Sequence, residues 1–295
     1  MGQIGQVGGD GQIRLLAIDI DGTLLDSKGR LPDAHRDVLV AAAAKGIEVA
    51  LVTGRSFHFS QSIVALLPIP VTLINNNGAL VKDASGATLM RHLLPRDTAH
   101  AVLRGTPEFE DSVALMFDRP PGSVDRQVVY ERMDWSHPNR RGYFEKNSAF
   151  IGETATLAGA LTEDPIQVMF NGGFAAMRAL AARLKALPIV DRYSVSLTEY
   201  EHRDFSLVDV NGAGCSKGAT LARWAQTRGF ARDAVLAAGD NLNDVEMLDY
   251  AGTAVLMGNA SDDVRRRVPR ARLTTSNDEG GLASALRDLL RGLRD

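Results

Sequence analysis

Carboxylates gather in two short segments of this chain, and each segment directly follows an apolar run. The first is Asp19-Ile20-Asp21-Gly22-Thr23, and the second is Gly239-Asp240-Asn241-Leu242-Asn243-Asp244. In the first segment, one carboxylate could attack a phosphorus atom while the other acts as acid and base. In the second, two acids and two amides offer the oxygen ligands that a hard divalent cation prefers. Taken singly, each segment could equally be a turn that caps the next helix.

Two further segments could hold a phosphoryl group. Val52-Thr53-Gly54-Arg55 combines a hydroxyl with a backbone N–H at the start of a predicted helix, which suits a phosphoryl oxygen. Ser216-Lys217-Gly218 places an ammonium at another predicted helix start, where it can neutralise the phosphoryl group and the attacking carboxylate. Without the other segments, Thr53 could be a simple N-cap and Lys217 a solvated helix lysine.

The elements expected around these segments alternate between strand and helix. We expect strands at 14–20, 47–52, 71–74, 234–238, 253–256 and 270–274, and helices at 32–45, 56–67, 216–228, 243–250 and 281–290. Such alternation predicts an α/β fold with a Rossmann-like parallel sheet as its core. Because open α/β sheets bind ligands at the carboxyl ends of their strands, the chemistry-bearing segments are expected at that edge.

A stretch of different texture interrupts this pattern. Between residues 84 and 205 we expect short strands at 113–117, 128–131, 166–170 and 193–197, and a helix at 175–187. The stretch therefore predicts an inserted α+β cap domain, 84–205, with an open antiparallel sheet. The catalytic core would be discontinuous and comprise residues 13–83 and 206–292. The glycine-rich start, residues 1–12, is predicted to be a flexible tail.

In type and order, the four segments resemble the four motifs of the haloacid dehalogenase-like (HAD) superfamily. The long interval between Thr53 and Lys217 holds the insertion, and a mixed α+β cap at that place resembles the Cof-type branch, subfamily IIB. The run Asn75-Asn76-Asn77-Gly78-Ala79 also resembles the Asn-Gly-Ala that this branch carries before its cap. The match covers the split core.

The resemblance implies a role for each matching position. Asp19 would be the nucleophile and a magnesium ligand. Asp21 would be the general acid and then the base, with its backbone carbonyl on the metal. Thr53 and Lys217 would hold the phosphoryl group, and Asp240 would be the third protein ligand of Mg²⁺.

Five more residues are expected around these. Asn243 would contact the phosphoryl group or support its loop, and Asp244 would lie behind the metal ligands. Arg55 could meet the leaving group from the core side. Gly54 and Asn77 complete the candidates for substrate binding.

These roles imply a magnesium-dependent phosphatase that hydrolyses a small phosphorylated metabolite, such as a sugar phosphate, through a phosphoaspartate. A sugar phosphomutase of the phosphomannomutase type stays open, because the motifs do not show what accepts the phosphoryl group. A phosphate-sensing module without catalysis is the alternative from a different class, and the intact acidic and basic motif residues argue against it.

The composition narrows the possible partners. The 295 residues are 45% hydrophobic and 23% charged, which is ordinary for a soluble globular protein. The formal net charge of −3 lacks the basic excess of a nucleic-acid binder. The single cysteine, Cys215, excludes an internal disulfide and favours a reducing compartment. We therefore expect a cytoplasmic protein with a small-molecule partner and neither a nucleic-acid nor a membrane partner, while its oligomeric state stays open.

Overall fold

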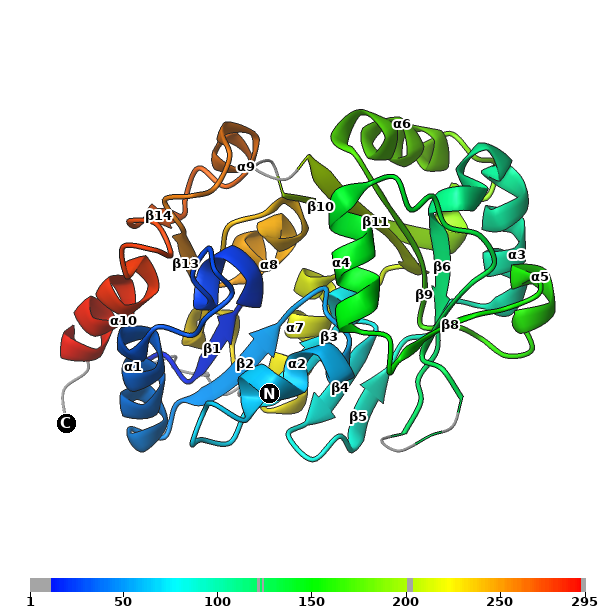
Figure 1. Ribbon diagram of the computed structural model, residues 1–295. Coiled ribbons are helices and arrows are strands. Elements are labelled where there is room, and N and C mark those ends of the chain that lie inside the picture. Colours follow the sequence, from blue (N-terminus) through cyan, green and yellow to red (C-terminus); the bar gives the residue numbers. More distant parts are fainter. Residues whose placement is uncertain (1–11, 121–122, 124, 201–203, 293–295) are drawn as a thin grey trace, which may run out of the picture.

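The structure is a computed structural model that describes residues 12–120, 123, 125–200 and 204–292. The strands of these residues form one sheet of eight strands and one of six. Figure 1 shows the two sheets in separate halves of the molecule, each with its own helices. Apart from Gln12, the predicted tail lies outside the described residues. None of the helices in the described ranges is long and apolar enough to cross a membrane.

The eight-stranded sheet contains all the strands that the sequence predicts for the core. Its order is β14-β13-β12-β1-β2-β3-β4-β5, with parallel pairing from β14 to β3 and antiparallel pairing from β3 to β5. The bounds are β1 (Leu15–Ile18), β2 (Glu48–Val52), β3 (Thr72–Asn75), β4 (Leu80–Asp83), β5 (Thr88–Arg91), β12 (Val235–Gly239), β13 (Thr253–Leu256) and β14 (Arg272–Leu273).

Helices cover both faces of this sheet, which explains why β1 is apolar at every position. Leu16 and Ile18 pack on one face with α1 (Asp33–Ala44), α2 (Phe57–Val64) and α10 (Gly281–Gly292). Leu15 and Ala17 pack on the other with α7 (Lys217–Thr227), α8 (Val245–Tyr250) and α9 (Asp262–Arg267). The predicted Rossmann-like α/β core is therefore confirmed.

The six-stranded sheet belongs to the predicted cap. Its order is β10-β11-β9-β6-β7-β8. The strands are β6 (Val113–Met116), β7 (Val128–Tyr130), β8 (Ile151–Glu153), β9 (Gln167–Gly172), β10 (Tyr193–Tyr200) and β11 (Phe205–Gly212). The helices are α3 (Arg96–Gly105), α4 (Pro138–Lys146), α5 (Leu157–Ala160) and α6 (Phe174–Lys185).

One pair in the cap sheet departs from the predicted antiparallel arrangement. β7 and β8 run parallel, whereas the other pairs of described strands are antiparallel. The connection between these two strands contains α4, and a crossover of this length lets the chain return in the same direction.

Strand pairing moves the chain crossings away from the predicted limits. β5 lies beyond residue 83, yet it pairs with β4 in the core sheet. β11 starts where the core was expected to resume, yet it pairs with β9 and β10 in the cap sheet. We therefore infer crossings near residues 92 and 212 rather than at 84 and 205. A strand pattern does not say which sheet the strand joins, because its partners are distant in sequence.

The two crossings lie side by side. The His92 backbone N–H donates to the Ala79 carbonyl at 2.7 Å, at the start of the core hairpin. A Cβ atom added at Gly212 would lie 2.8 Å from the Leu93 carbonyl oxygen and 2.8 Å from the His92 ring. The chain thus enters and leaves the cap at neighbouring points, which is the arrangement of a two-stranded hinge.

Candidate active site

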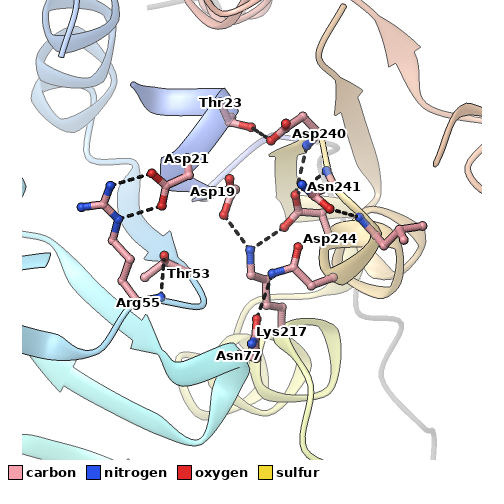
Figure 2. A network of polar contacts seen from close by, with 12 residues as sticks. Asp19, Asp21, Thr23, Thr53, Arg55, Asn77, Lys217, Asp240, Asn241 and Asp244 are labelled. Carbon is pink, nitrogen blue, oxygen red and sulfur yellow. Dashed lines mark hydrogen bonds and ion pairs between the residues drawn. The ribbon is translucent and has the colours of Figure 1, made fainter. Parts of the chain in front are cut away.

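The predicted motif residues meet at the carboxyl edge of the core sheet. Asp19 follows β1, Thr53 follows β2, and Asp240 follows β12. Lys217 opens α7, whose N-cap Ser216 accepts a hydrogen bond from the Ala219 N–H at 2.9 Å. Figure 2 shows the side chains of these four residues around one small space.

The turn after β1 lets the two acidic segments approach each other. Residues Ile20–Leu24 form a single wide turn, in which Gly22 has φ 83° and the flanking Asp21 is non-helical. A Cβ atom at position 22 would lie 2.3 Å from the Asp240 Oδ2 atom. Only glycine satisfies both the backbone conformation and the close approach.

A buried lysine links the two acidic segments. The Lys217 ammonium donates to Asp19 Oδ1 and to Asp244 Oδ1, at 2.6 Å each, and Lys217 is 1% exposed. The other oxygen of Asp244 accepts the backbone N–H groups of Asp240 and Asn241 at 3.0 Å each. Asp244 therefore holds the lysine and the loop in place, in the position predicted for it behind Asp19 and Asp240.

The cluster carries more negative than positive charge. Burial, and then the charge of Asp244, raise the pKa of Asp19 to about 8, although Lys217 opposes that shift. Burial and the charge of Asp19 also raise the pKa of Asp240 well above its ordinary value. Burial lowers the pKa of Lys217, but its two carboxylate partners outweigh that effect and raise it. A further cation would favour the ionised form of both acids.

The donor set fits a hard divalent cation. One carboxylate oxygen each from Asp19, Asp240 and Asp244 lies within 4.8 Å of the others. Asp244 already accepts three hydrogen bonds, one of them from an ammonium, so Asp19 and Asp240 are the better placed ligands. So few protein oxygen ligands suit Mg²⁺, because this ion retains several of its water ligands.

Asp21 points away from this cluster toward Arg55, as Figure 2 shows. The Arg55 guanidinium binds both Asp21 oxygens, with Nε to Oδ2 at 2.7 Å and Nη2 to Oδ1 at 2.5 Å. Arg55 also donates to the Phe59 carbonyl at 3.3 Å. The two acids that stand two residues apart in the sequence thus have different partners, Lys217 for Asp19 and Arg55 for Asp21.

The remaining predicted residues lie near these acids on the core side of a cavity. Thr53 Oγ1 accepts the Arg55 N–H at 3.1 Å, and the Thr53 carbonyl accepts the Asn77 N–H at 3.0 Å. The Asn243 amide donates to Asn77 Oδ1 at 2.9 Å. Thr53, Gly54, Arg55 and Asn243 line a cavity, whereas Asn77 is fully buried behind them.

This cavity has a volume of about 630 Å³ and lies between core and cap. Core residues, among them Asp19 and Asp21, form one side. Side chains of the cap sheet form the other, from β6, β9, β10 and β11. The cap also contacts the acidic loop directly, since the Asn241 side chain donates to the Glu199 carbonyl at 2.8 Å. The acidic cluster therefore opens into a chamber that the cap covers.

A family model described as haloacid dehalogenase-like hydrolase matches residues 16–286. The chain belongs to this family. Phosphatase YwpJ of Bacillus subtilis is 28% identical to this hydrolase over 94% of the chain and 100% of that protein. Pyridoxal phosphate phosphatase YbhA of Escherichia coli is 28% identical over 86% of the chain and 91% of that protein.

Solved structures agree with this assignment. The phosphatase BT1666 from Bacteroides thetaiotaomicron superposes on this hydrolase with a TM-score of 0.75 and 25% identity, and 98% of each chain is covered. The subclass IIB sugar phosphatase BT4131 has the same fold, with a TM-score of 0.70 and 20% identity over 93% of this chain and 98% of that chain. The resemblance to the Cof-type HAD proteins, and the enzyme class it implies, are confirmed.

Two residues of this hydrolase that contact Asp240 were not predicted from the sequence. Thr23 Oγ1 donates to Asp240 Oδ1 at 3.1 Å. The Asn259 amide donates to Asp240 Oδ2 at 3.0 Å and to the Gly22 carbonyl at 2.9 Å. Thr23 stands inside the first motif, and Asn259 follows the end of β13. Polar residues were expected just after the core strands, and the same expectation applied to β13 would have identified Asn259.

Cys215 lies beside the lysine but has no thiolate chemistry to offer. Its side chain is fully buried and contacts the Asn77 carbonyl at 3.8 Å. Burial raises the pKa of the thiol to about 12, so it stays protonated. Cys215 is therefore a small packing residue next to Lys217.

Proposed function

We propose that this hydrolase is a magnesium-dependent phosphatase that hydrolyses a small phosphorylated metabolite through a phosphoaspartate on Asp19. The observation that carries the proposal is the Asp19–Lys217–Asp244 ion-pair network beside Asp240, open to a chamber of metabolite size. The relatives' names support it, since YwpJ and YbhA are both phosphatases.

Asp19 makes the first bond. One of its oxygens is held by Lys217, which leaves Oδ2 for attack on phosphorus. As the Asp19–phosphorus bond forms, the ester P–O bond breaks. The Lys217 ammonium offsets charge on the nucleophile, and Thr53 with the adjacent backbone N–H groups holds the phosphoryl oxygens. Mg²⁺ beside Asp19, Asp240 and the Asp21 carbonyl would offset the repulsion between a carboxylate and a phosphate dianion.

Asp21 moves the proton. It gives a proton to the leaving-group oxygen, and later takes one from the water that attacks the phosphoaspartate. That attack breaks the Asp19–phosphorus bond and releases inorganic phosphate. Because Arg55 binds both oxygens of Asp21, the carboxyl group has to turn out of that grip to exchange a proton. Substrate that enters beside Arg55 would trigger this rotation of the Asp21 carboxyl group.

Phosphate release from a panel of phosphorylated metabolites tests this proposal. We expect release that requires magnesium, stops on chelation, and disappears in Asp19→Asn. Asp97→Asn, an exposed acid on α3, is the matched control and should keep full activity. Release of phosphate without any activating bisphosphate separates a phosphatase from a phosphomutase. Activity of Asp19→Asn within about tenfold of the parent would refute the nucleophile assignment.

A further inference from the structure

One strand of the cap divides its side chains between the cap interior and the substrate chamber. Along β11, Val208 and Val210 pack in the cap core. Phe205, Leu207 and Asp209 alternate with them and line the chamber. Asp209 is thus the single carboxylate that the described cap strands present to this space, and it is 2% exposed.

Neutral amides donate hydrogen bonds to this carboxylate, and no cation among the described residues pairs with it. The Asn77 amide donates to Asp209 Oδ2 at 2.8 Å, and the Gln167 amide donates to Oδ1 at 2.7 Å. A carboxylate has about four acceptor sites, so each oxygen of Asp209 can accept one more hydrogen bond. Burial raises the pKa of Asp209 to about 7 even with the Asn77 bond. The fold keeps a buried acid whose charge it does not neutralise, and that is costly unless another donor arrives.

Apolar side chains from cap and core also line the chamber that Asp209 faces. Met116 and Met169 extend the same face of the cap sheet, with Met169 opposite Asp209 in the strand register. Phe59 from the core and Phe150 from the cap pack edge to face, with ring centroids 5.9 Å apart. Both rings line the chamber. These side chains offer a surface for a flat or compact apolar part of a ligand, next to the polar residues that also line the chamber.

We propose that Asp209 determines specificity by accepting a hydrogen bond from an N–H group of the leaving group. The substrate class is a phosphate monoester whose leaving group carries a protonated nitrogen beside a compact apolar part. The proposal rests on the phosphatase function proposed above and adds the recognition of the leaving group. Asp209 on β11 would bind the nitrogen, while Asp19 and its neighbours in the core would bind the phosphate on the other side of the chamber.

A purely structural part for Asp209 makes a different prediction. In that case, the carboxylate only links Asn77 of the core to Gln167 of the cap. Its loss would then weaken turnover of every ester to the same degree. A recognition part predicts selective loss, confined to esters that carry the donor.

Paired esters distinguish the two. We would measure kcat/KM for phenyl phosphate, for methylbenzyl phosphates and for aminomethylbenzyl phosphates, in their ortho, meta and para forms. The parent should prefer the best aminomethyl isomer over its methyl partner by about tenfold or more, as for a charged hydrogen bond. In Asp209→Asn, that preference should shrink to about threefold or less, with phenyl phosphate changed little. Glu153→Gln, an exposed acid on β8, is the control.

Each other outcome has a definite meaning. A parent enzyme without preference for the aminomethyl ester overturns the proposal, as does a preference that survives in Asp209→Asn. Equal loss on all esters in a folded Asp209→Asn also overturns it and leaves the structural link. If circular dichroism shows that this variant is unfolded, Asp209→Ser makes the same comparison. Failure of the parent to release phosphate from any of these esters or from metabolites would instead contradict the phosphatase function.

Discussion

Asp19 faces opposite requirements from its surroundings and from its chemistry. It must be ionised to attack phosphorus, yet burial and the charge of Asp244 raise its pKa to about 8. The unfolded value is near 3.8, so between these values the metal-free folded chain holds a proton that the unfolded chain has lost. The contribution of this group to stability is therefore lost as the pH rises through that window. A cation bound beside Asp19 would offset the cost of burying the ionised carboxylate, because it would take the place of the proton.

Magnesium should accordingly stabilise the protein more at high pH than at low pH. We expect the rise in Tm on adding magnesium to be larger near pH 8 than near pH 6, because fewer protons then compete for the ligands. Differential scanning fluorimetry, with chelator as the reference, measures this rise. Asp19→Asn should show a smaller rise that depends less on pH. A rise that is equal at both pH values would mean that Asp19 does not exchange a proton for the metal.

Asp21 and Arg55 should differ in their dependence on the leaving group. Asp21→Asn removes the proton donor, so we expect a loss of about a hundredfold or more on an alkyl phosphate, whose oxygen needs protonation. The loss should be much smaller on nitrophenyl phosphate, which leaves as a stable anion. Arg55→Ala keeps the carboxyl group and should lose less on the alkyl ester. Steady-state kcat values decide this, and equal losses of Asp21→Asn on both esters would remove Asp21 from the proton transfer.

Residue type and motif order were enough to predict which acids and which lysine gather. Asp19 and Asp240 follow strands that share one edge of the sheet. Lys217 and Asp244 stand at helix starts, and the resemblance to the HAD motifs placed them beside these acids. Neither the strand-end rule nor the resemblance predicted the pairing of Asp21 with Arg55. The partners of side chains at a turn depend on the local backbone geometry. Here Gly22 sets that geometry, so the spacing of the acids in the sequence does not predict their partners.

At the scale of the elements, the strands that the sequence missed or misplaced are those whose identity depends on their neighbours. β5 is an edge strand, half exposed along its length, so it lacks the apolar run that marks β1 or β2. No strand was expected at Phe205–Gly212, and residues 206–212 were counted with the core, although β11 pairs on both sides with cap strands. Local pattern predicts a strand, and tertiary pairing decides its sheet.

The turn after β1 gives a direct test of how an element shapes the metal site. Gly22→Ala adds a methyl group that would lie 2.3 Å from Asp240 Oδ2, in a backbone conformation with φ 83°. We expect magnesium affinity to fall by about tenfold or more, as for lost support of a metal ligand. Gly29→Ala is the matched control, since Gly29 has φ 73° and open space around it. Isothermal titration with magnesium compares the two, and equal affinities would show that the approach of Gly22 to Asp240 is dispensable.

At the scale of the whole molecule, cap and core meet along the chamber and at the hinge. The contact between Asn241 and Glu199 ties the acidic loop to the end of β10. The crossings near 92 and 212 lie together, so the cap is connected through one small region. Opening there would admit substrate, and closing would exclude water from the phosphoaspartate.

Cap removal should therefore depend on where the chain is cut. Deleting residues 93–211 and joining the ends with a short glycine-serine linker keeps β5 in the core sheet and removes β11 with its partners. We expect a folded core that binds magnesium and slowly hydrolyses an activated ester without preference among natural substrates. Deleting residues 86–203 instead should give an insoluble product, because β11 would lose its partner strands and β5 would be removed from the core sheet. Circular dichroism and the ester assay compare the two shortened proteins, and a core that keeps the parent's substrate ranking would place selection outside the cap.

The proposed reaction requires a phosphoryl group on Asp19, and borohydride trapping detects that group. Borohydride reduces an acyl phosphate but not a free carboxylate, and it converts a phosphorylated aspartate to homoserine. After quenching a reaction with substrate and magnesium, peptide mass spectrometry should find homoserine at position 19 alone, and none without substrate. Turnover with an unmodified Asp19, or homoserine at position 21 or 240 in its place, would contradict the account.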